Sequence, residues 1–218
     1  AATNAKELFD VYKNYQKDRL SLILSNEKDS KTILEVGASS GQFLYHLKEN
    51  FEEINAIELD LACCNFLRNE LNIKADSEYL RESIFSNETY DVVCSFQVLE
   101  HVPNPVNFLQ DLKLSSNVGH NIYIEVPNLN DPLLSVWSPE SYREFFYHSA
   151  HLHYFTEDSL MKVAIEAGFK EENVEISYTQ DYNLLNHLHW VMNDSPQDNC
   201  HTGLSEVKLE GKNNLISE

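Results

Sequence analysis

Short apolar runs alternate with stretches of helical spacing along most of the 218-residue chain. Apolar runs bounded by polar or turn residues predict strands at residues 31–37, 54–60, 90–96, 120–126 and 173–179. Apolar positions three and four apart predict helices at residues 5–25, 42–50, 61–71, 106–114, 156–168 and 182–193. This alternation predicts an α/β fold with a doubly wound, mostly parallel sheet and helices on both faces.

The predicted elements divide the chain into three parts. Residues 1–30 form a helical segment, residues 31–180 hold the alternating core, and residues 181–218 add a helix and a polar tail. An insertion at residues 128–156 interrupts the core and is rich in aromatic and histidine residues. Thr156 and Gly168 suit the two caps of the helix that follows it. Long loops in compact domains tend to carry function, so the insertion is a candidate binding segment.

The composition is that of a globular protein with a strongly acidic surface. Hydrophobic residues make up 42% of the chain, and 35 acidic against 16 basic residues give a net charge of −19. Such a charge repels phosphate backbones and anionic lipids, which disfavours nucleic-acid and membrane partners. Four cysteines without metal-type spacing predict free thiols in a reducing cytoplasm. A small neutral or cationic ligand is compatible with this charge.

The turn after the first predicted strand carries only small side chains. Residues 33–41 read ILEVGASSG, with Gly37 and Gly41 framing the turn. Ligands of doubly wound sheets lie outside the carboxyl ends of the strands, and a bare turn permits close approach of the backbone. The spacing lacks the third glycine of a dinucleotide fingerprint. Glu35 would repel a pyrophosphate but attract a cation, such as an amino group or a sulfonium.

A second acidic mark follows at the end of the next predicted strand. Glu58 and Asp60 lie in the stretch INAIELD. A carboxylate at this place can accept hydrogen bonds from ribose hydroxyls. The two marks together favour a nucleoside that carries a positively charged amino-acid tail.

These residues resemble the class I S-adenosylmethionine-dependent methyltransferases, whose first motif is similar to ILEVGASSG and whose acidic second strand is similar to INAIELD. YDVVCSFQVLEHVPNP and IYIEVPN resemble the regions of the family's fourth and fifth strands. HSAHLHYFTEDSLMKVAIEAGF is similar to a segment that follows the fifth strand in members acting on sugars and other small molecules. The resemblance implies a Rossmann-like fold, S-adenosylmethionine as the cofactor, and a small-molecule acceptor.

The resemblance also implies cofactor roles for individual residues. The first turn would hold the methionine end, Glu58 the ribose, Asp76 the border of the adenine, and residues 95–97 the region beside the reactive methyl. The cofactor-binding residues expected are Glu35, Gly37, Ala38, Ser39, Gly41, Glu58, Leu59, Asp76, Ser95, Phe96 and Gln97. Many relatives have glycine where Ser39 stands.

A hydroxyl acceptor has to be oriented and has to lose a proton. Histidine suits this task because its ordinary pKa lies near neutrality. The candidates are His151, His153 and His101, and alternation along an extended segment would place the first two on one side with Leu152 opposite. A packing role is the alternative for His101. Some sugar methyltransferases that this segment resembles carry a glutamate before the histidine, where Ala150 stands here, which disfavours carbon as the acceptor.

Acceptor-binding candidates lie between the fifth predicted strand and the end of the insertion. They are Glu125, Asn128, Tyr147 and Tyr154. The aromatic residues of the insertion suit stacking on a sugar ring, or form a small core of their own. A zinc site of His148, His151 and His153 is a further alternative, although their spacing lacks a metal motif and no metal is expected.

The sequence therefore predicts a cytoplasmic enzyme that transfers a methyl group from S-adenosylmethionine to a small molecule. An oxygen of a sugar or sugar nucleotide used in surface-glycan synthesis is the favoured acceptor. N- or C-methylation of another metabolite, a nicotinamide-dependent oxidoreductase and a non-catalytic cofactor-binding module are the alternatives. The helix at 182–193 is either structural or part of a homodimer contact.

Overall fold

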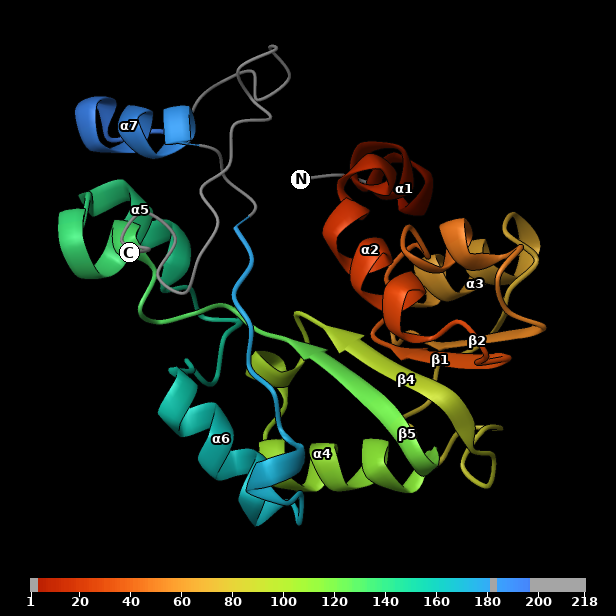
Figure 1. The fold of residues 1–218 in the computed structure, drawn as a ribbon. Helices are drawn as coiled ribbons and strands as arrows, with labels where there is room; N and C mark the ends of the chain where they lie inside the picture. The colour runs from red at the N-terminus through yellow and green to blue at the C-terminus, as the bar shows by residue number, and fades with distance from the viewer. Residues whose placement is uncertain (1–3, 181–183, 197–218) are drawn as a thin grey trace. The chain divides into compact units, whose positions relative to one another are not determined.

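The computed structural model describes residues 4–180 and 184–196, and the chain divides into two compact units, residues 1–126 and 127–218. The first unit is built on a five-stranded parallel sheet in the order β3-β2-β1-β4-β5 (Figure 1). Helices α1 to α3 lie on one side of this sheet and α4 lies on the other (Figure 1). The strands are β1 (Thr32–Val36), β2 (Glu53–Ile57), β3 (Lys74–Asp76), β4 (Tyr90–Phe96) and β5 (Ser116–Glu125). The predicted doubly wound parallel fold is confirmed, and β3 is a strand that the sequence pattern missed.

The helices of the first unit agree with the apolar pattern except at two places. The segment predicted as one helix over residues 5–25 is broken near Gln16, whose side-chain amide donates to the carbonyl of Tyr12 (3.0 Å). A polar side chain that bonds the backbone in this way competes with the regular helix. The helical segments are α1 (Ala5–Tyr12), the 3₁₀ turn η1 (Lys13–Tyr15), α2 (Lys17–Asn26), α3 (Leu61–Asn69), η3 (Leu99–His101) and α4 (Pro105–Leu114).

The second departure is the helix predicted over residues 42–50, which is wrong. Only a 3₁₀ turn, η2 (Leu44–Leu47), forms there. The side chains of Leu44 and Leu47 are both fully buried. Residues three apart line up in a 3₁₀ helix, so this short turn buries both without a longer α-helix.

Parallel pairing places the carboxyl ends of the central strands at the same edge of the sheet. In the strand register Val36 lies opposite Ile57, and Phe96 lies opposite Glu125. β1 is buried along four of its five residues, as expected of a central parallel strand. The turns that follow β1, β2, β4 and β5 therefore share one edge of the sheet.

The second unit is helical where it is described. Its helical segments are the π-helical turn η4 (Leu133–Trp137), α5 (Glu140–Phe146), α6 (Glu157–Glu166), the 3₁₀ turn η5 (Glu171–Asn173) and α7 (Leu184–Asn193). The caps predicted for α6 are confirmed, because the hydroxyl of Thr156 accepts from the N–H of Ser159 and Gly168 has φ +91°. None of the helices in the described ranges is long and apolar enough to cross a bilayer.

The strand predicted over residues 173–179 is wrong. The burial of these residues does alternate, with Val174, Ile176 and Tyr178 less exposed than their neighbours. No strand within the described residues pairs with them, however. A strand needs the hydrogen bonds of a neighbour, which a period of two along the sequence cannot supply.

Candidate active site

The turn after β1 has a backbone that only small residues permit. Gly37, Ser39 and Gly41 all have positive φ, at +83°, +48° and +77°. A Cβ on Gly37 would lie 2.3 Å from Val98 Cγ2, and one on Gly41 would lie 2.4 Å from Leu67 Cδ2. The N–H groups of Gly37 and Ala38 both donate to the carbonyl of Ile57. The absence of large side chains in this turn is therefore required by its fold, and it leaves the backbone open to a ligand.

The carboxylate of Glu58 lies directly against this turn. Its Oε2 accepts from the N–H of Ser39 (2.6 Å), and its Oε1 accepts from the N–H of Asp60 (2.8 Å). Asp60 in turn caps α3 by accepting from the N–H of Cys63 (2.9 Å). Because each carboxylate oxygen can accept more than one hydrogen bond, Glu58 keeps acceptor capacity for a ligand.

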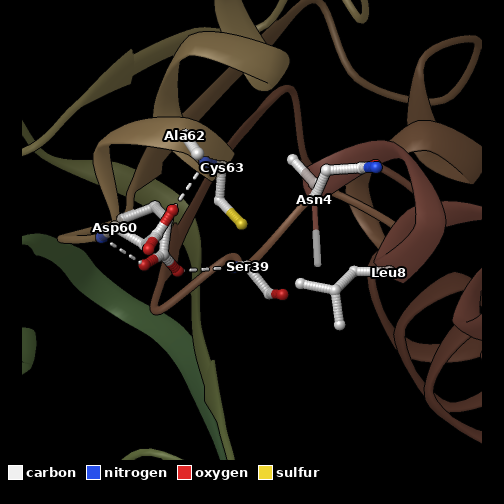
Figure 2. Close-up of a pocket in the computed structure, with 8 residues that line it drawn as sticks. Asn4, Leu8, Ser39, Asp60, Ala62 and Cys63 are labelled. Carbon is white, nitrogen blue, oxygen red and sulfur yellow. Dashed lines mark hydrogen bonds between the residues drawn. The ribbon is translucent and has the colours of Figure 1, made fainter. Parts of the chain in front are cut away.

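A cavity of about 280 Å³ opens beside Glu58. One wall comes from the turns after β1 and β2, and the other comes from the start of α1 (Figure 2). The sequence did not predict that α1 would contribute to this site. The cavity is lined by Asn4, Ala5, Leu8, Ser39, Glu58, Asp60, Ala62 and Cys63.

Glu35 is buried at the end of β1, with 3% of its surface exposed. Its Oε2 has no hydrogen-bond partner among the described residues. Burial raises the pKa of Glu35 to about 8; the charge of Arg19 opposes this increase, and Glu58 and Glu125 add to it. The sequence led us to expect a carboxylate here, but a pKa of about 8 makes this group mainly a neutral acid at pH 7.

An ion-pair network joins α2 to the ends of β4 and β5. Arg19 donates through Nε to Glu125 Oε2 (2.9 Å) and through Nη2 to the other oxygen of the same carboxylate. The amide of Gln97 also donates to Glu125 Oε1 (2.9 Å), and the guanidinium lies 4.7 Å from the ring centre of Phe96. Although burial acts in the opposite direction, Arg19 holds the pKa of Glu125 below its usual range. Glu125 is thus a charged carboxylate whose two oxygens both accept hydrogen bonds from Arg19.

Two other residues expected at the cofactor have structural partners. The hydroxyl of Ser95 donates to the carbonyl of Val36 (2.8 Å) and is fully buried. The two oxygens of Asp76 accept from the N–H groups of Ser77 (2.9 Å) and Ile84 (2.8 Å). Leu59, in contrast, is 48% exposed after β2 and is open to an apolar ligand surface.

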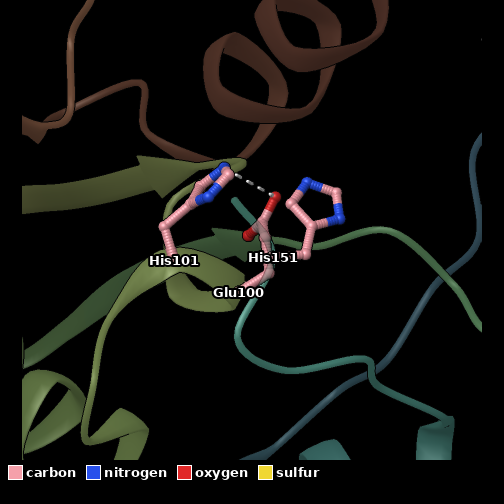
Figure 3. Close-up of side chains that lie close together, drawn as sticks. All are labelled: Glu100, His101 and His151. Atoms are coloured by element: carbon pink, nitrogen blue, oxygen red, sulfur yellow. Dashed lines mark ion pairs between the residues drawn. The ribbon is translucent and has the colours of Figure 1, made fainter. Parts of the chain in front are cut away.

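The 3₁₀ turn after β4 holds an acid–histidine pair. Glu100 is buried, neither of its oxygens has a hydrogen-bond partner among the described residues, and Oε1 lies 3.9 Å from His101 Nε2 (Figure 3). Burial raises the pKa of Glu100. His101 therefore has a defined polar neighbour, which is compatible with either the basic or the packing role expected for it.

The insertion brings two of its histidines and two of its tyrosines together in the second unit. The rings of His148 and His151 are 3.8 Å apart, and those of Tyr147 and Tyr154 are 5.0 Å apart. Leu152 is 55% exposed, whereas His151 and His153 are partly buried, as alternation predicts. These side chains remain acceptor-side candidates.

The side chain of Asn128 has a local role. Its Oδ1 accepts from the N–H of Asn130 (3.0 Å), and its backbone pairs with Phe155 as an isolated parallel bridge. This bridge joins the two ends of the insertion. Asn128 therefore has a structural role in the second unit, and its predicted contact with the acceptor is still a prediction.

A parallel sheet with a glycine turn after β1, an acidic residue after β2 and a cavity beside them defines a Rossmann-like nucleoside-binding protein. The profile of the methyltransferase-domain family matches residues 8–174, and the chain belongs to this family. This confirms the predicted family and S-adenosylmethionine as its cofactor. No curated protein matches the chain.

Two solved structures illustrate the similarity of fold. A SAM-dependent methyltransferase from Archaeoglobus fulgidus is 21% identical, with a TM-score of 0.63 over 79% of this chain and 75% of that one. A sugar N-methyltransferase from a Streptoalloteichus species is 15% identical, with a TM-score of 0.50 over 59% of this chain and 56% of that one. At these identities the likeness supports the fold and leaves the acceptor open.

Proposed function

We propose that the protein transfers the methyl group of S-adenosylmethionine to an oxygen of a small molecule, with a sugar or sugar nucleotide as the favoured acceptor. The observation that carries the proposal is the open cavity beside Glu58 and the glycine turn, in a chain of the methyltransferase-domain family. The proposal includes a cytoplasmic role in surface-glycan synthesis. This role depends on the acceptor being a sugar or sugar nucleotide.

The residues present fit the cofactor. The unpartnered Oε2 of buried Glu35 suits the ammonium group of the methionine end, and the carboxylate of Glu58 suits the ribose hydroxyls. The positive φ of Gly37 and the lack of room for a Cβ there let the backbone approach the ligand closely. Leu59 offers an exposed apolar side chain to the adenine.

When bound, S-adenosylmethionine supplies an activated methyl group whose transfer needs no further leaving-group activation. The protein then has to orient the acceptor, exclude water and accept one proton from an attacking hydroxyl. We assign the proton to one of His101, His151 and His153. Tyr147 and Tyr154 are proposed to contact the acceptor, since their rings pack against each other with centroids 5.0 Å apart and aromatic faces suit stacking on a sugar.

Nitrogen is the alternative acceptor atom. One of the structural neighbours is a sugar N-methyltransferase, which is the reason to test it. An amine that is already neutral needs no strong base. The dependence of turnover on the three histidines therefore separates the two chemistries. Carbon is disfavoured because Ala150 stands where some sugar methyltransferases have a glutamate.

A turnover assay tests the proposal directly. The protein is incubated with S-adenosylmethionine and a panel of sugar nucleotides, amino-sugar nucleotides and small hydroxylated metabolites, and S-adenosylhomocysteine is measured. We expect product with at least one hydroxylated sugar and a large loss in His151→Ala or His153→Ala. Calorimetry with both cofactors is the control: binding of NAD without binding of S-adenosylmethionine would overturn the proposal in favour of an oxidoreductase.

A further inference from the structure

The exposed face of α5 in the second unit carries a cavity that the contacts proposed for the cofactor do not use. Its volume is about 310 Å³, near the lower end of the range of ~300–1,000 Å³ that is usual for small-molecule sites. The cavity is lined by Glu140, Arg143, Glu144 and Tyr147. These positions are three and four apart, so they share one face of the helix. The other face of α5 is buried through Tyr142 and Phe146, which hold the helix in an apolar cluster.

The charged side chains of this cavity do not neutralise one another. Arg143 lies three residues after Glu140, a spacing at which helices commonly form an ion pair. Within the described ranges, however, no ion pair or hydrogen bond engages the guanidinium of Arg143. Glu140 and Glu144 are four residues apart, where like charges repel each other. Stabilisation of this seven-residue helix therefore does not explain the three charged side chains.

The cavity combines an excess of negative charge with one aromatic ring. Two carboxylates and one guanidinium leave a single negative charge in excess, which disfavours a phosphate. Tyr147 is 46% exposed, and its ring packs against those of Phe146 and Tyr154 with centroids 5.4 Å and 5.0 Å apart. A ring held in this way suits stacking on a sugar. Carboxylates accept hydrogen bonds from hydroxyl and ammonium groups, and a guanidinium donates to hydroxyl oxygens.

The cavity is also connected to a histidine that is a candidate for the proton acceptor. The ring of Tyr154, which contacts Tyr147, lies 5.5 Å from the ring of His151. The hydroxyl of Tyr154 donates to the carbonyl of His148 (3.3 Å). A sugar stacked on Tyr147 would therefore be separated from His151 by one aromatic side chain.

We propose that the cavity on α5 is an acceptor subsite for an amino sugar, with the sugar ring on Tyr147 and its ammonium group at the carboxylates of Glu140 and Glu144. This inference rests on the proposed function and deepens it by naming the class of acceptor. Arg143 donates to the hydroxyl groups of the ring. The ammonium group brings the net charge of the occupied cavity close to zero, which neither a neutral sugar nor a sugar phosphate does.

The experiment measures sugar binding without the cofactor. Ligand-observed NMR gives Kd for glucosamine, galactosamine and mannosamine, each beside its N-acetyl derivative, at low ionic strength and a pH at which the amine is protonated. We expect at least one amino sugar to bind more tightly than its N-acetyl derivative. Glu140→Gln and Glu144→Gln should each reduce this preference by about two- to fivefold, the effect of an exposed ion pair. Tyr147→Leu should weaken both members of the pair alike, because it removes the stacking surface.

Glu166→Gln is the matched control, because Glu166 is an exposed glutamate on α6 and its loss changes the net charge of the chain equally. It should leave the preference unchanged. All these variants alter exposed side chains, and an unchanged unfolding temperature shows that each is folded.

Two outcomes overturn the inference. One is that none of the three amino sugars binds more tightly than its N-acetyl derivative, and the other is that Glu140→Gln and Glu144→Gln reduce the preference no more than Glu166→Gln does. The turnover assay is read separately. The expected binding pattern without S-adenosylhomocysteine from any acceptor contradicts the proposed function, while the amino-sugar site itself stands.

Discussion

If Glu35 contacts the ammonium group of the cofactor as proposed, binding of the cofactor should depend on pH. Before a ligand binds, this buried carboxyl is mainly neutral at pH 7, because burial raises its pKa to about 8. An ammonium group placed against the unpartnered Oε2 would favour the ionised form and lower that pKa again. The complex then binds fewer protons than the empty protein, so binding strengthens as the pH rises toward 8 and levels off above it.

The size of this effect follows from the pKa. With a pKa of about 8, most of Glu35 is protonated at pH 7 before the ligand binds, so each binding event should release close to one proton. Between pH 8 and pH 6 the affinity should fall by about 50-fold, since each pH unit well below the pKa costs about 1.4 kcal/mol. The groups that face Glu35 and enter this balance are Arg19 on α2, Cys94 on β4, Glu58 after β2 and Glu125 on β5.

Calorimetry with S-adenosylhomocysteine measures the release directly. The titration is run at pH 7 in two buffers of different ionisation enthalpy, with the wild type, Glu35→Gln and, as a control for an exposed glutamate, Glu49→Gln. Glu35→Gln should bind without proton release from this position, whereas the control should behave like the wild type. Equal release by the wild type and Glu35→Gln, or no release by either, would refute the reasoning.

Three further predictions follow from single side chains. Gly41→Ala should lower the free energy of unfolding by about 2–4 kcal/mol, because the new Cβ clashes with buried Leu67 and the backbone φ is positive. Gly119→Ala is the control, since Gly119 has φ +88° but no atom within 4 Å of the new Cβ, and it should cost only about 1–2 kcal/mol. Urea unfolding measures both values. Glu58→Gln should weaken cofactor binding by about tenfold in the same calorimetric assay, since its new NH₂ group faces backbone donors, and an unchanged Kd would remove Glu58 from the site. Burial lowers the pKa of His187 to about 4. The contribution of His187 to stability is therefore complete above about pH 6.5 and is lost as the pH falls from there toward 4. The difference in unfolding temperature between pH 7 and pH 4.5 should be smaller for His187→Gln than for the wild type.

The parts of the fold that could be predicted from the sequence are those in which burial alone determines the local structure. β4 coincides with the predicted strand at residues 90–96, because its side chains are buried on both faces and most of them are apolar. β3 has only three residues, two of them charged, and offers no such run. The segment 173–179 shows the opposite error, since its pattern resembles a strand but pairing depends on a neighbour elsewhere in the fold.

The site could be predicted in part for the same reason. The turn at residues 37–41 and the acid at 58 are local features, fixed by a strand end and the residues that follow it. Arg19 could not be predicted, because its partner lies 106 positions away and nothing in the sequence around either residue indicates the other. The contribution of α1 to the cavity depends equally on tertiary packing.

The electrostatics of the site change the explanation of how an acidic chain selects a charged cofactor. The net charge of −19 suggests simple attraction of a cation. In the folded protein, however, Glu35 is neutral at pH 7 until a ligand arrives, and Glu125 is paired with Arg19. Glu58 is the carboxylate of this set that is left for a ligand, and it is held by two N–H groups beside the cavity. With Glu35 at the ammonium group as proposed, selectivity for a positive charge would arise mainly when Glu35 ionises on binding. Raising the salt concentration should then weaken cofactor affinity less than lowering the pH from 8 to 6.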